Sequence, residues 1–295
     1  MGPDFLIIGA QKAGTTSLHA YLGQHPEVFL PVRKEPHFFC APGDGGPPPW
    51  RGPADLAVRW ALTWDPDRYA DLFADAAGRT TGEASTMYLV DPAVPDRVVA
   101  ANPAVRVIVV LRDPVARAHS AWWMWRRARL EPLDFAEALA AEARRCADGW
   151  GPNYAYRANG RYGEHLARWR GVLDPAQMLV LRDDDLRHAR RATVQAVFAF
   201  LGVDDTFVPD LDRELNGHGA QPDVRRHHPR HLVRAARVRA RRMVPPVWRR
   251  STWPAPLPRH RPPIPLAVEA DLRNGYADDV AATETILGWD LSAWR

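Results

Sequence analysis

The chain has 295 residues and a formal net charge of +4, with 46% hydrophobic and 25% charged residues. This composition excludes a wholly disordered protein, a collagen and a coiled coil, and no apolar run reaches the roughly 20 residues of a membrane span. Two cysteines, Cys40 and Cys146, are too few for a disulfide framework or a cysteine-based zinc site. The N-terminus enters an apolar strand at Asp4 without the basic region and cleavage site of a signal peptide. We therefore expect one cytoplasmic domain over 1–295 with reduced cysteines.

Strand and helix patterns alternate along most of the sequence. Short apolar or β-branched runs predict strands at 5–8, 80–84, 105–111 and 178–181. Helical patterns predict helices at 16–22, from 114 through 122–125, and at 134–147, 162–173, 190–201 and 266–288. This alternation indicates an α/β fold: a single P-loop-like domain with a central parallel sheet flanked by helices. Its ligand should bind at the carboxyl ends of the strands.

Two segments interrupt the alternation. Residues 41–55 are rich in glycine and proline and are predicted to be a loop or lid. Residues 217–265 are basic and proline-rich, and the stretch from Val224 to Val268 holds twelve arginines and no acidic residue. We expect a loop region there with one amphipathic helix near 229–243. Peripheral contact of 229–253 with an anionic membrane is one interpretation of this segment.

The first predicted strand runs into the sequence GAQKAGTTS at 9–17. A glycine-bounded turn between a strand and a helix directs backbone N–H groups and the positive end of the helix at one point, which suits a phosphate. The spacing of Gly9 and Gly14 matches a P-loop, but Thr15-Thr16 stands where a kinase loop has lysine followed by serine or threonine. Lys12, one of only two lysines in the chain, lies inside the loop.

The stretch QKAGTTSL at 11–18 resembles the 5′-phosphosulfate loop of sulfotransferases that use 3′-phosphoadenosine 5′-phosphosulfate (PAPS). The resemblance implies that Lys12 contacts the oxygen bridging phosphate and sulfate. There it would stabilise the negative charge that grows on the leaving oxygen. It also implies that no metal is needed and that the 5′-phosphate is held by the loop, that is by Gln11, Lys12, Ala13, Gly14, Thr15, Thr16 and Ser17.

A second motif, VVLRDPVARAHS at 109–120, resembles the 3′-phosphate site of the same family. The resemblance implies that Arg112, at the strand end, and Ser120, on the following helix, bind the 3′-phosphate of PAPS and of its product, the 3′,5′-bisphosphate PAP. An arginine fork beside a hydroxyl is suited to a phosphate. Family members also place a basic loop over this phosphate before the last helix, which points to Arg225 or Arg226.

A third motif, RKEPHFF at 33–39, resembles the segment that carries the general base in the heparan-sulfate branch of the family and its bacterial relatives. The resemblance implies that Glu35 is the base and that Lys34 and His37 assist it. An alcohol needs such a positioned proton acceptor at neutral pH. The alternative is a solvated Lys34–Glu35 pair in front of two core phenylalanines.

The stretch GEASTMY at 82–88 resembles a further family segment, a strand end whose polar residues face the active site. Glu83 and Ser85 alternate along the predicted strand and therefore project to one face. We expect them to line the acceptor pocket together with Tyr88. The alternative is that they are structural polar residues.

The expected function is transfer of a sulfuryl group from PAPS to an acceptor hydroxyl of a carbohydrate, glycolipid or secondary metabolite. No metal and no nucleic-acid partner are expected. One alternative is a P-loop kinase for a nucleotide or small molecule, which would have to hold Mg²⁺ without the usual loop. A second is a polyanion-binding protein that uses the arginine-rich segment. The sequence determines neither the acceptor nor the oligomeric state.

Overall fold

The computed structural model describes residues 2–42, 46, 48–59, 63–212 and 257–295. Its centre is a parallel sheet in the order β2-β3-β1-β4-β5. The strands are β1 (Phe5–Gly9), β2 (Val28–Phe29), β3 (Thr80–Ala84), β4 (Arg106–Leu111) and β5 (Met178–Arg182). The predicted parallel sheet and its four longer strands are confirmed. The two-residue edge strand β2 was not predicted, because it is too short to show a periodic pattern.

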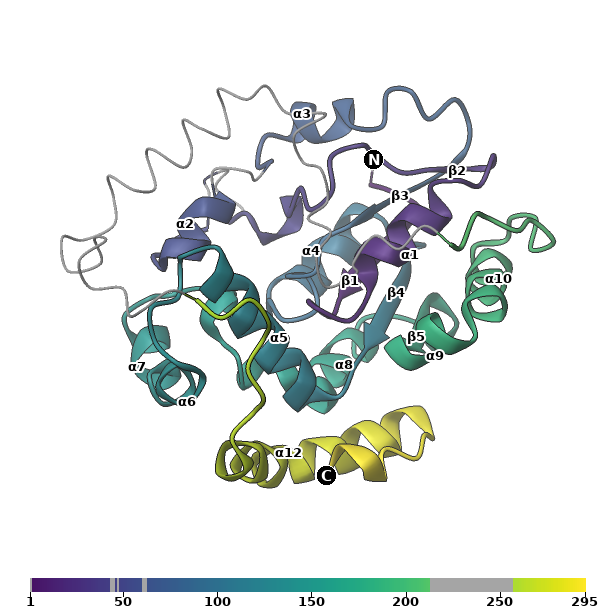
Figure 1. Cartoon of the computed structure of the whole chain (residues 1–295). Helices are drawn as coiled ribbons and strands as arrows, with labels where there is room; N and C mark the ends of the chain where they lie inside the picture. Colours follow the sequence, from purple (N-terminus) through teal and green to yellow (C-terminus); the bar gives the residue numbers. More distant parts are fainter. Residues whose placement is uncertain (1, 43–45, 47, 60–62, 213–256) are drawn as a thin grey trace.

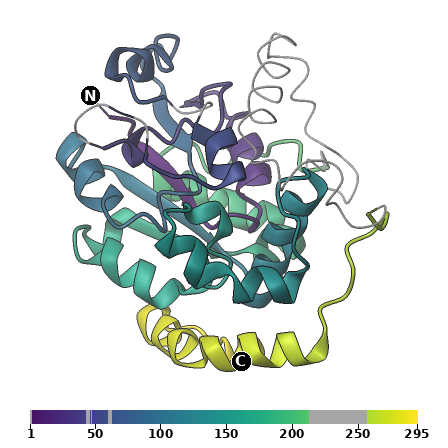
Figure 2. The same ribbon diagram turned by 90° about the vertical axis from the view of Figure 1, so that its left-hand side faces the viewer.

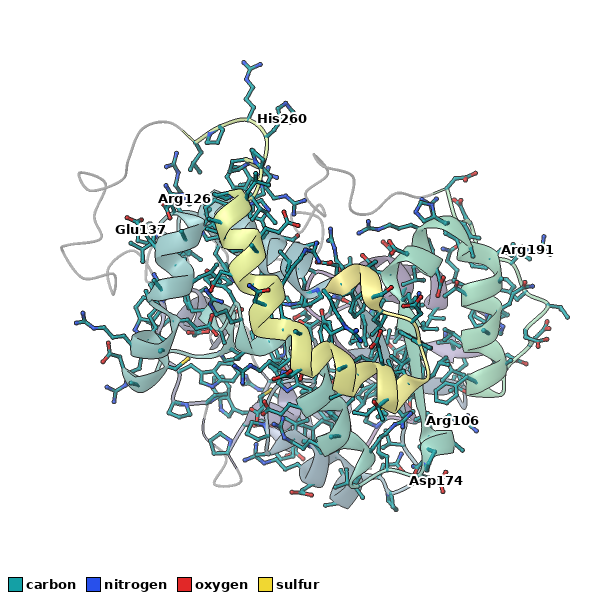
Figure 3. All side chains as sticks on the ribbon, turned by 90° about the horizontal axis from the view of Figure 1, so that it is seen from below. Arg106, Arg126, Glu137, Asp174, Arg191 and His260 are labelled. Atoms are coloured by element: carbon teal, nitrogen blue, oxygen red, sulfur yellow. The ribbon has the colours of Figure 1, made fainter. Side chains whose placement is uncertain are left out.

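Helices cover both faces of this sheet (Figure 1). They are α1 (Thr15–Leu22), α2 (Pro53–Arg59), α3 (Pro66–Asp71), α4 (Val94–Ala101), α5 (Pro114–Arg127), α6 (Phe135–Ala140), α7 (Glu142–Ala147), α8 (Tyr162–Arg170), α9 (Asp183–His188), α10 (Arg190–Leu201) and α12 (Leu266–Leu287). Helix α12 packs against α8 and α5 along one side of the molecule (Figure 2). Seen from below (Figure 3), it crosses in front of the domain, and His260 lies beyond its first turn.

Several boundaries differ from the prediction. The single helix expected at 134–147 is two helices, α6 and α7, separated at Ala141. Helix α2 begins inside the loop predicted at 41–55. The cause is tertiary, because the buried Asp55 carboxylate accepts the backbone N–H groups of Gly151 at 2.8 Å and of Asn153 at 3.2 Å. Short helices α3, α4 and α9 were also missed. The helix predicted at 229–243 lies outside the described residues.

Two adjacent strands, β1 and β4, form the centre of the core. All five residues of β1 are buried, and so are the last five of β4. A strand of a parallel sheet with helices on both faces must be apolar on both faces, which explains the continuous runs of valine, isoleucine and leucine. The rigid centre therefore carries the two loops with the phosphate motifs, one after each strand.

Replacing Gly82 with alanine should destabilise this centre. Gly82 of β3 lies opposite Phe5 of β1, and a Cβ there would lie 2.2 Å from the Phe5 ring. Relieving that clash requires the sheet to shift, so the free energy of unfolding should fall by about 1 to 3 kcal/mol in a urea titration. Gly275→Ala is the control, because its Cβ meets only the end of Arg157 at 3.8 Å and alanine favours the helix. Equal stability of wild type and Gly82→Ala would contradict the close approach.

Candidate active site

The site residues come from segments that follow neighbouring strands. The 9–14 loop follows β1, Ser85 and Thr86 follow β3, Arg112 follows β4 and Asp183 follows β5. Since all these strands are parallel, their carboxyl ends share one edge of the sheet. The structure therefore brings together residues that are up to about 170 positions apart in the sequence.

The loop after β1 presents a free helix start. Gly14, the residue before α1, has φ 94° in the left-handed region, and no side chain caps the helix. The Ser17 N–H bonds to the Gly14 carbonyl at 3.0 Å, which leaves the N–H groups of Thr15 and Thr16 for a ligand. Gln11 is anchored beside the loop, where its Nε2 donates to Asn153 Oδ1 at 3.3 Å. Ala13 and Thr15 are buried, whereas Thr16 and Ser17 are half-buried at the helix start.

Lys12 lies within this loop and next to the second phosphate motif. Its Nζ is 3.8 Å from Met124 Sδ of α5, and its carbonyl oxygen accepts from Arg112 Nη1 at 3.1 Å. Burial and the neighbouring Arg112 charge lower the pKa of Lys12. Because the surroundings disfavour the protonated form of Lys12, a bound anion stabilises its charge more than it would stabilise a fully solvated lysine.

A single ammonium group joins the loop to the third motif. Lys34 Nζ donates to Thr16 Oγ1 at 3.2 Å and to Glu35 Oε1 at 3.0 Å. Thr16 belongs to the first turn of α1, and Glu35 belongs to the segment expected to serve the acceptor. The contact therefore spans the boundary between the expected nucleotide side and the expected acceptor side.

Glu35 is held at both carboxylate oxygens. Oε1 accepts from Lys34, while Oε2 lies 3.1 Å from His37 Nε2 and accepts from Thr86 Oγ1 at 3.1 Å. Burial opposes ionisation, but the Lys34 charge and the His37 hydrogen bond hold the pKa of this carboxyl well below its usual range. Its side chain is 33% exposed, so a substrate can reach it. A solvated Lys34–Glu35 pair would lack the additional contacts of Glu35 with His37 and Thr86.

Glu83, Ser85 and Tyr88, which were expected to line the acceptor pocket, lie next to the 37–39 segment. The side chains of Glu83, Ser85 and Tyr88 are buried. Ser85 Oγ accepts from the His37 backbone N–H at 3.0 Å and donates to Glu83 Oε2 at 2.8 Å. Tyr88 Oη accepts from the Phe39 backbone N–H at 3.3 Å. Burial raises the pKa of Glu83 to about 7. In this arrangement the three side chains support His37, while Thr86, which we had not predicted, reaches Glu35.

The second phosphate motif contains a cluster of charges. Arg112 Nε lies 3.5 Å from Asp183 Oδ2, and Arg187 Nη2 lies 2.6 Å from the same oxygen. Burial lowers the pKa of Arg112, and the charges of Arg187 and Arg261 lower it further, against the opposing effect of Asp183. Ser120 is half-buried on α5. Sequence reasoning missed Asp183, Arg187 and Arg261.

Two signals pointed to those residues. Arg261 belongs to the twelve-arginine stretch, and the structure places its charge close enough to Arg112, Lys12 and His119 to lower the pKa of each. The acidic run 183–185 directly follows a predicted strand, where ligand contacts are expected. The two arginines proposed from the sequence to cover the 3′-phosphate, Arg225 and Arg226, lie outside the described residues.

Two further features were searched for in the described ranges. They hold no group of three or more histidine, cysteine, aspartate or glutamate side chains able to bind a metal ion. Within the same ranges, every helix is too short or too polar to cross a membrane.

A glycine-bounded loop after the first strand of a parallel sheet, next to a second basic strand end and a clamped carboxylate, is typical of a P-loop-like transferase. Comparison with known proteins gives the family. The model of the sulfotransferase domain matches residues 84–215. The crystal structure of a sulfotransferase from Alicyclobacillus acidocaldarius is 31% identical with a TM-score of 0.79, over 100% of this chain and 99% of that one. The chain belongs to the sulfotransferase family.

Curated relatives extend this result. The human bifunctional heparan sulfate N-deacetylase/N-sulfotransferases 2 and 3 are 28% and 29% identical over 213 residues, which is 68% of this chain and 22% of each relative. The chain therefore spans about a fifth of their length. Mouse sulfotransferase SULT7A1, solved in complex with PAP, shares the fold at 14% identity and a TM-score of 0.51, over 96% of this chain and 85% of that one.

The expected fold class is thus confirmed, and the family is the one that the sequence motifs resemble. The kinase and the polyanion-binding alternatives are not favoured, since the relatives and the structural neighbours are sulfotransferases.

Proposed function

We propose that the protein transfers a sulfuryl group from PAPS to an acceptor, with Glu35 as the proton acceptor and Lys12 at the leaving oxygen. The observation that carries this proposal is the position of Lys34 Nζ between Thr16 Oγ1 and Glu35 Oε1. One ammonium can touch both groups only if the phosphate loop and the carboxylate are about 6 Å apart or less, given hydrogen bonds of about 3 Å. That separation suits direct transfer between a bound donor and a bound acceptor.

The described residues fit a polyanionic nucleotide. Beyond the lowering by burial, the charges of Arg112 and Arg261 lower the pKa of Lys12, and the charge of Arg261 lowers that of Arg112, because these positive charges face a common region. The uncapped start of α1 adds N–H donors at the same edge. An anion with phosphates at both ends would neutralise this region. When bound, PAPS would supply the activated sulfuryl group.

Each side chain near Glu35 has a distinct role in this proposal. Glu35 takes the acceptor proton, and Thr86 and His37 hold its Oε2 in place. Lys34 is shared with Thr16, so a negative group bound at the loop attracts the ammonium and loosens its hold on Oε1. The carboxylate then becomes more basic as the donor binds. Lys12 stabilises the charge that develops on the leaving oxygen.

Two functional groups are candidates for the acceptor, a hydroxyl and an amine. A hydroxyl of a carbohydrate, glycolipid or secondary metabolite follows from the resemblance of the RKEPHFF motif. An amine is the second candidate, since the curated relatives carry N-sulfotransferase in their names. A screen with labelled PAPS against N-acetylated and N-deacetylated polysaccharides separates the two. Label transferred as an ester survives mild nitrous acid, whereas a sulfamate releases it, and transfer to no acceptor of either class would count against the proposal.

Arg112→Ala and Ser120→Ala should each weaken PAP binding about 10- to 100-fold, because each removes a hydrogen bond to a charged phosphate. Isothermal titration with PAP and with adenosine 5′-phosphate measures the effect. Only the bisphosphate should lose affinity, and Arg191→Ala, an exposed arginine on α10, is the control. Unchanged PAP affinity in both variants would show that the 3′-phosphate binds elsewhere.

A further inference from the structure

A buried carboxylate lies inside the cationic end of the site. Asp183 is the first residue of α9, directly after β5, and its side chain is only 6% exposed. One of its oxygens, Oδ2, is shared between Arg112 at 3.5 Å and Arg187 at 2.6 Å. An anion in a region that should attract anions calls for an explanation, because it weakens the positive potential that phosphate binding uses.

Charged groups from several elements face this carboxylate. Arg112 and Asp113 come from the end of β4 and the start of α5, while Asp184 and Arg187 come from α9 itself. The chain segment before α12 adds Arg261, whose charge lowers the pKa of Arg112 and whose own pKa is lowered by burial and by the charge of Arg187. In the same cluster, Arg112 Nη1 also donates to the carbonyl of Lys12.

We propose that Asp183 is a built-in counter-ion of the 3′-phosphate site, and that binding of a 3′-phosphorylated nucleotide must displace it from Arg112 or protonate it. The proposal rests on the assignment of Arg112 to the 3′-phosphate made above. In the ligand-free protein, Asp183 pairs with two arginines that would otherwise repel each other. When the phosphate takes its place at Arg112, the carboxylate becomes a second anion facing the first.

The coupling between the two anions has a definite sign. Burial raises the pKa of Asp183 to about 6, with Asp184 and Asp113 adding to the rise and Arg112 and Arg187 opposing it. A phosphate nearby favours the neutral carboxyl and raises that pKa further. Binding therefore takes up a proton, and PAP affinity should fall as the pH rises above about 6, by at most tenfold per pH unit.

The counter-ion limits affinity for nucleotides that carry the 3′-phosphate, PAP among them. It therefore favours release of the product at neutral pH, where the carboxylate is ionised. Asp183→Asn keeps the shape and removes the charge, so PAP should bind about tenfold more tightly to this variant at pH 8. At pH 5.5 the gain should shrink to within about twofold, because Asp183 of the wild type is then largely protonated. Adenosine 5′-phosphate, which lacks the 3′-phosphate, should gain nothing at either pH.

The experiment is isothermal titration of the full chain with both nucleotides at pH 5.5 and pH 8. Asp185→Asn is the matched control, since it removes one negative charge from an exposed position of the same helix. Repeating the titration in buffers of different ionisation enthalpy gives the number of protons taken up. PAP itself titrates in this range, so the difference between wild type and Asp183→Asn is the quantity to compare. Asp183→Ser is a second variant in case Asp183→Asn folds poorly.

Three outcomes would overturn the proposal. Weaker PAP binding by Asp183→Asn at pH 8 would mean that the carboxylate orients Arg112 for the phosphate. An equal gain in affinity for PAP and adenosine 5′-phosphate in Asp183→Asn would mean a general electrostatic effect. Equal proton uptake by wild type and Asp183→Asn would show that PAP binding does not protonate Asp183. Failure of the 3′-site assignment gives a different result, because Arg112→Ala would then leave PAP affinity unchanged.

Discussion

Glu35→Gln should lower the single-turnover rate of sulfuryl transfer by about 10²- to 10⁴-fold, with PAP affinity within about twofold of wild type. Glutamine keeps the shape of the side chain but cannot accept the acceptor proton. In the structure the Glu35 carboxylate contacts Lys34, His37 and Thr86, and among the described residues it makes no direct hydrogen bond to the 9–14 loop or to Arg112. Rapid-quench measurement with saturating PAPS reports the chemical step, and titration with PAP reports the nucleotide site.

Combining the two measurements distinguishes three roles for Glu35. A surface ion pair of the Lys34–Glu35 type contributes under about 1 kcal/mol and would leave the rate nearly unchanged. A structural role would lower both thermal stability and PAP affinity, because Lys34 links Glu35 to Thr16 of the phosphate loop. Glu164→Gln, an exposed carboxylate paired with Arg168 on α8, controls for the chemical change. A rate within about threefold of wild type would rule out the base assignment.

Lys12→Ala should lower turnover by about 10²- to 10³-fold, the scale seen when one group that stabilises developing charge is removed. The alanine variant keeps the backbone carbonyl that accepts from Arg112 Nη1, so the second phosphate motif should stay in place. Turnover is measured with labelled PAPS at saturation, and the affinity for PAP is measured alongside. Loss of PAP affinity without loss of the maximal rate would assign Lys12 to ground-state binding only.

Lys12→Arg is the sharper variant at the same position. It keeps the positive charge but replaces a compact ammonium by a planar fork, which does not fit contact with one bridging oxygen. Met124 Sδ already lies 3.8 Å from the lysine nitrogen, so the larger head group would also crowd the Met124 side chain. We therefore expect an activity closer to that of Lys12→Ala than to wild type. Full activity of the arginine variant would show that charge alone is needed.

The parts of the site that follow from local sequence were predictable. A buried apolar strand, a glycine-bounded turn and a helix start are encoded within about 20 consecutive residues, so the end of β1 and the start of α1 were predicted to within one residue. The same holds for β4, Arg112 and the start of α5, where Asp113 caps the helix by accepting the Ala116 N–H at 2.7 Å. The predicted PAPS-type motifs belong to these local units.

Contacts between distant segments were decided by the tertiary structure. The alternation of Glu83 and Ser85 along the predicted strand led to the prediction that both line the acceptor pocket. Alternation shows only that two side chains share a face, and not what that face meets. Which face meets the acceptor depends on the 33–39 segment, whose backbone covers that face through the bond from His37 N–H to Ser85. Similarly, no local pattern states that α2 is anchored by Asp55 to residues nearly a hundred positions away.

The charge cluster shows the same division. By itself the sequence determined the fold family, and it predicted the two phosphate motifs and the carboxylate Glu35, since each is a short run of residues next to its own strand or helix. Only the folded chain placed Asp183 and Arg261 beside Arg112, because parallel strands bring their carboxyl ends together regardless of how far apart they are in the sequence. Electrostatic energy depends on distance in space and on burial, and neither is encoded by position along the chain.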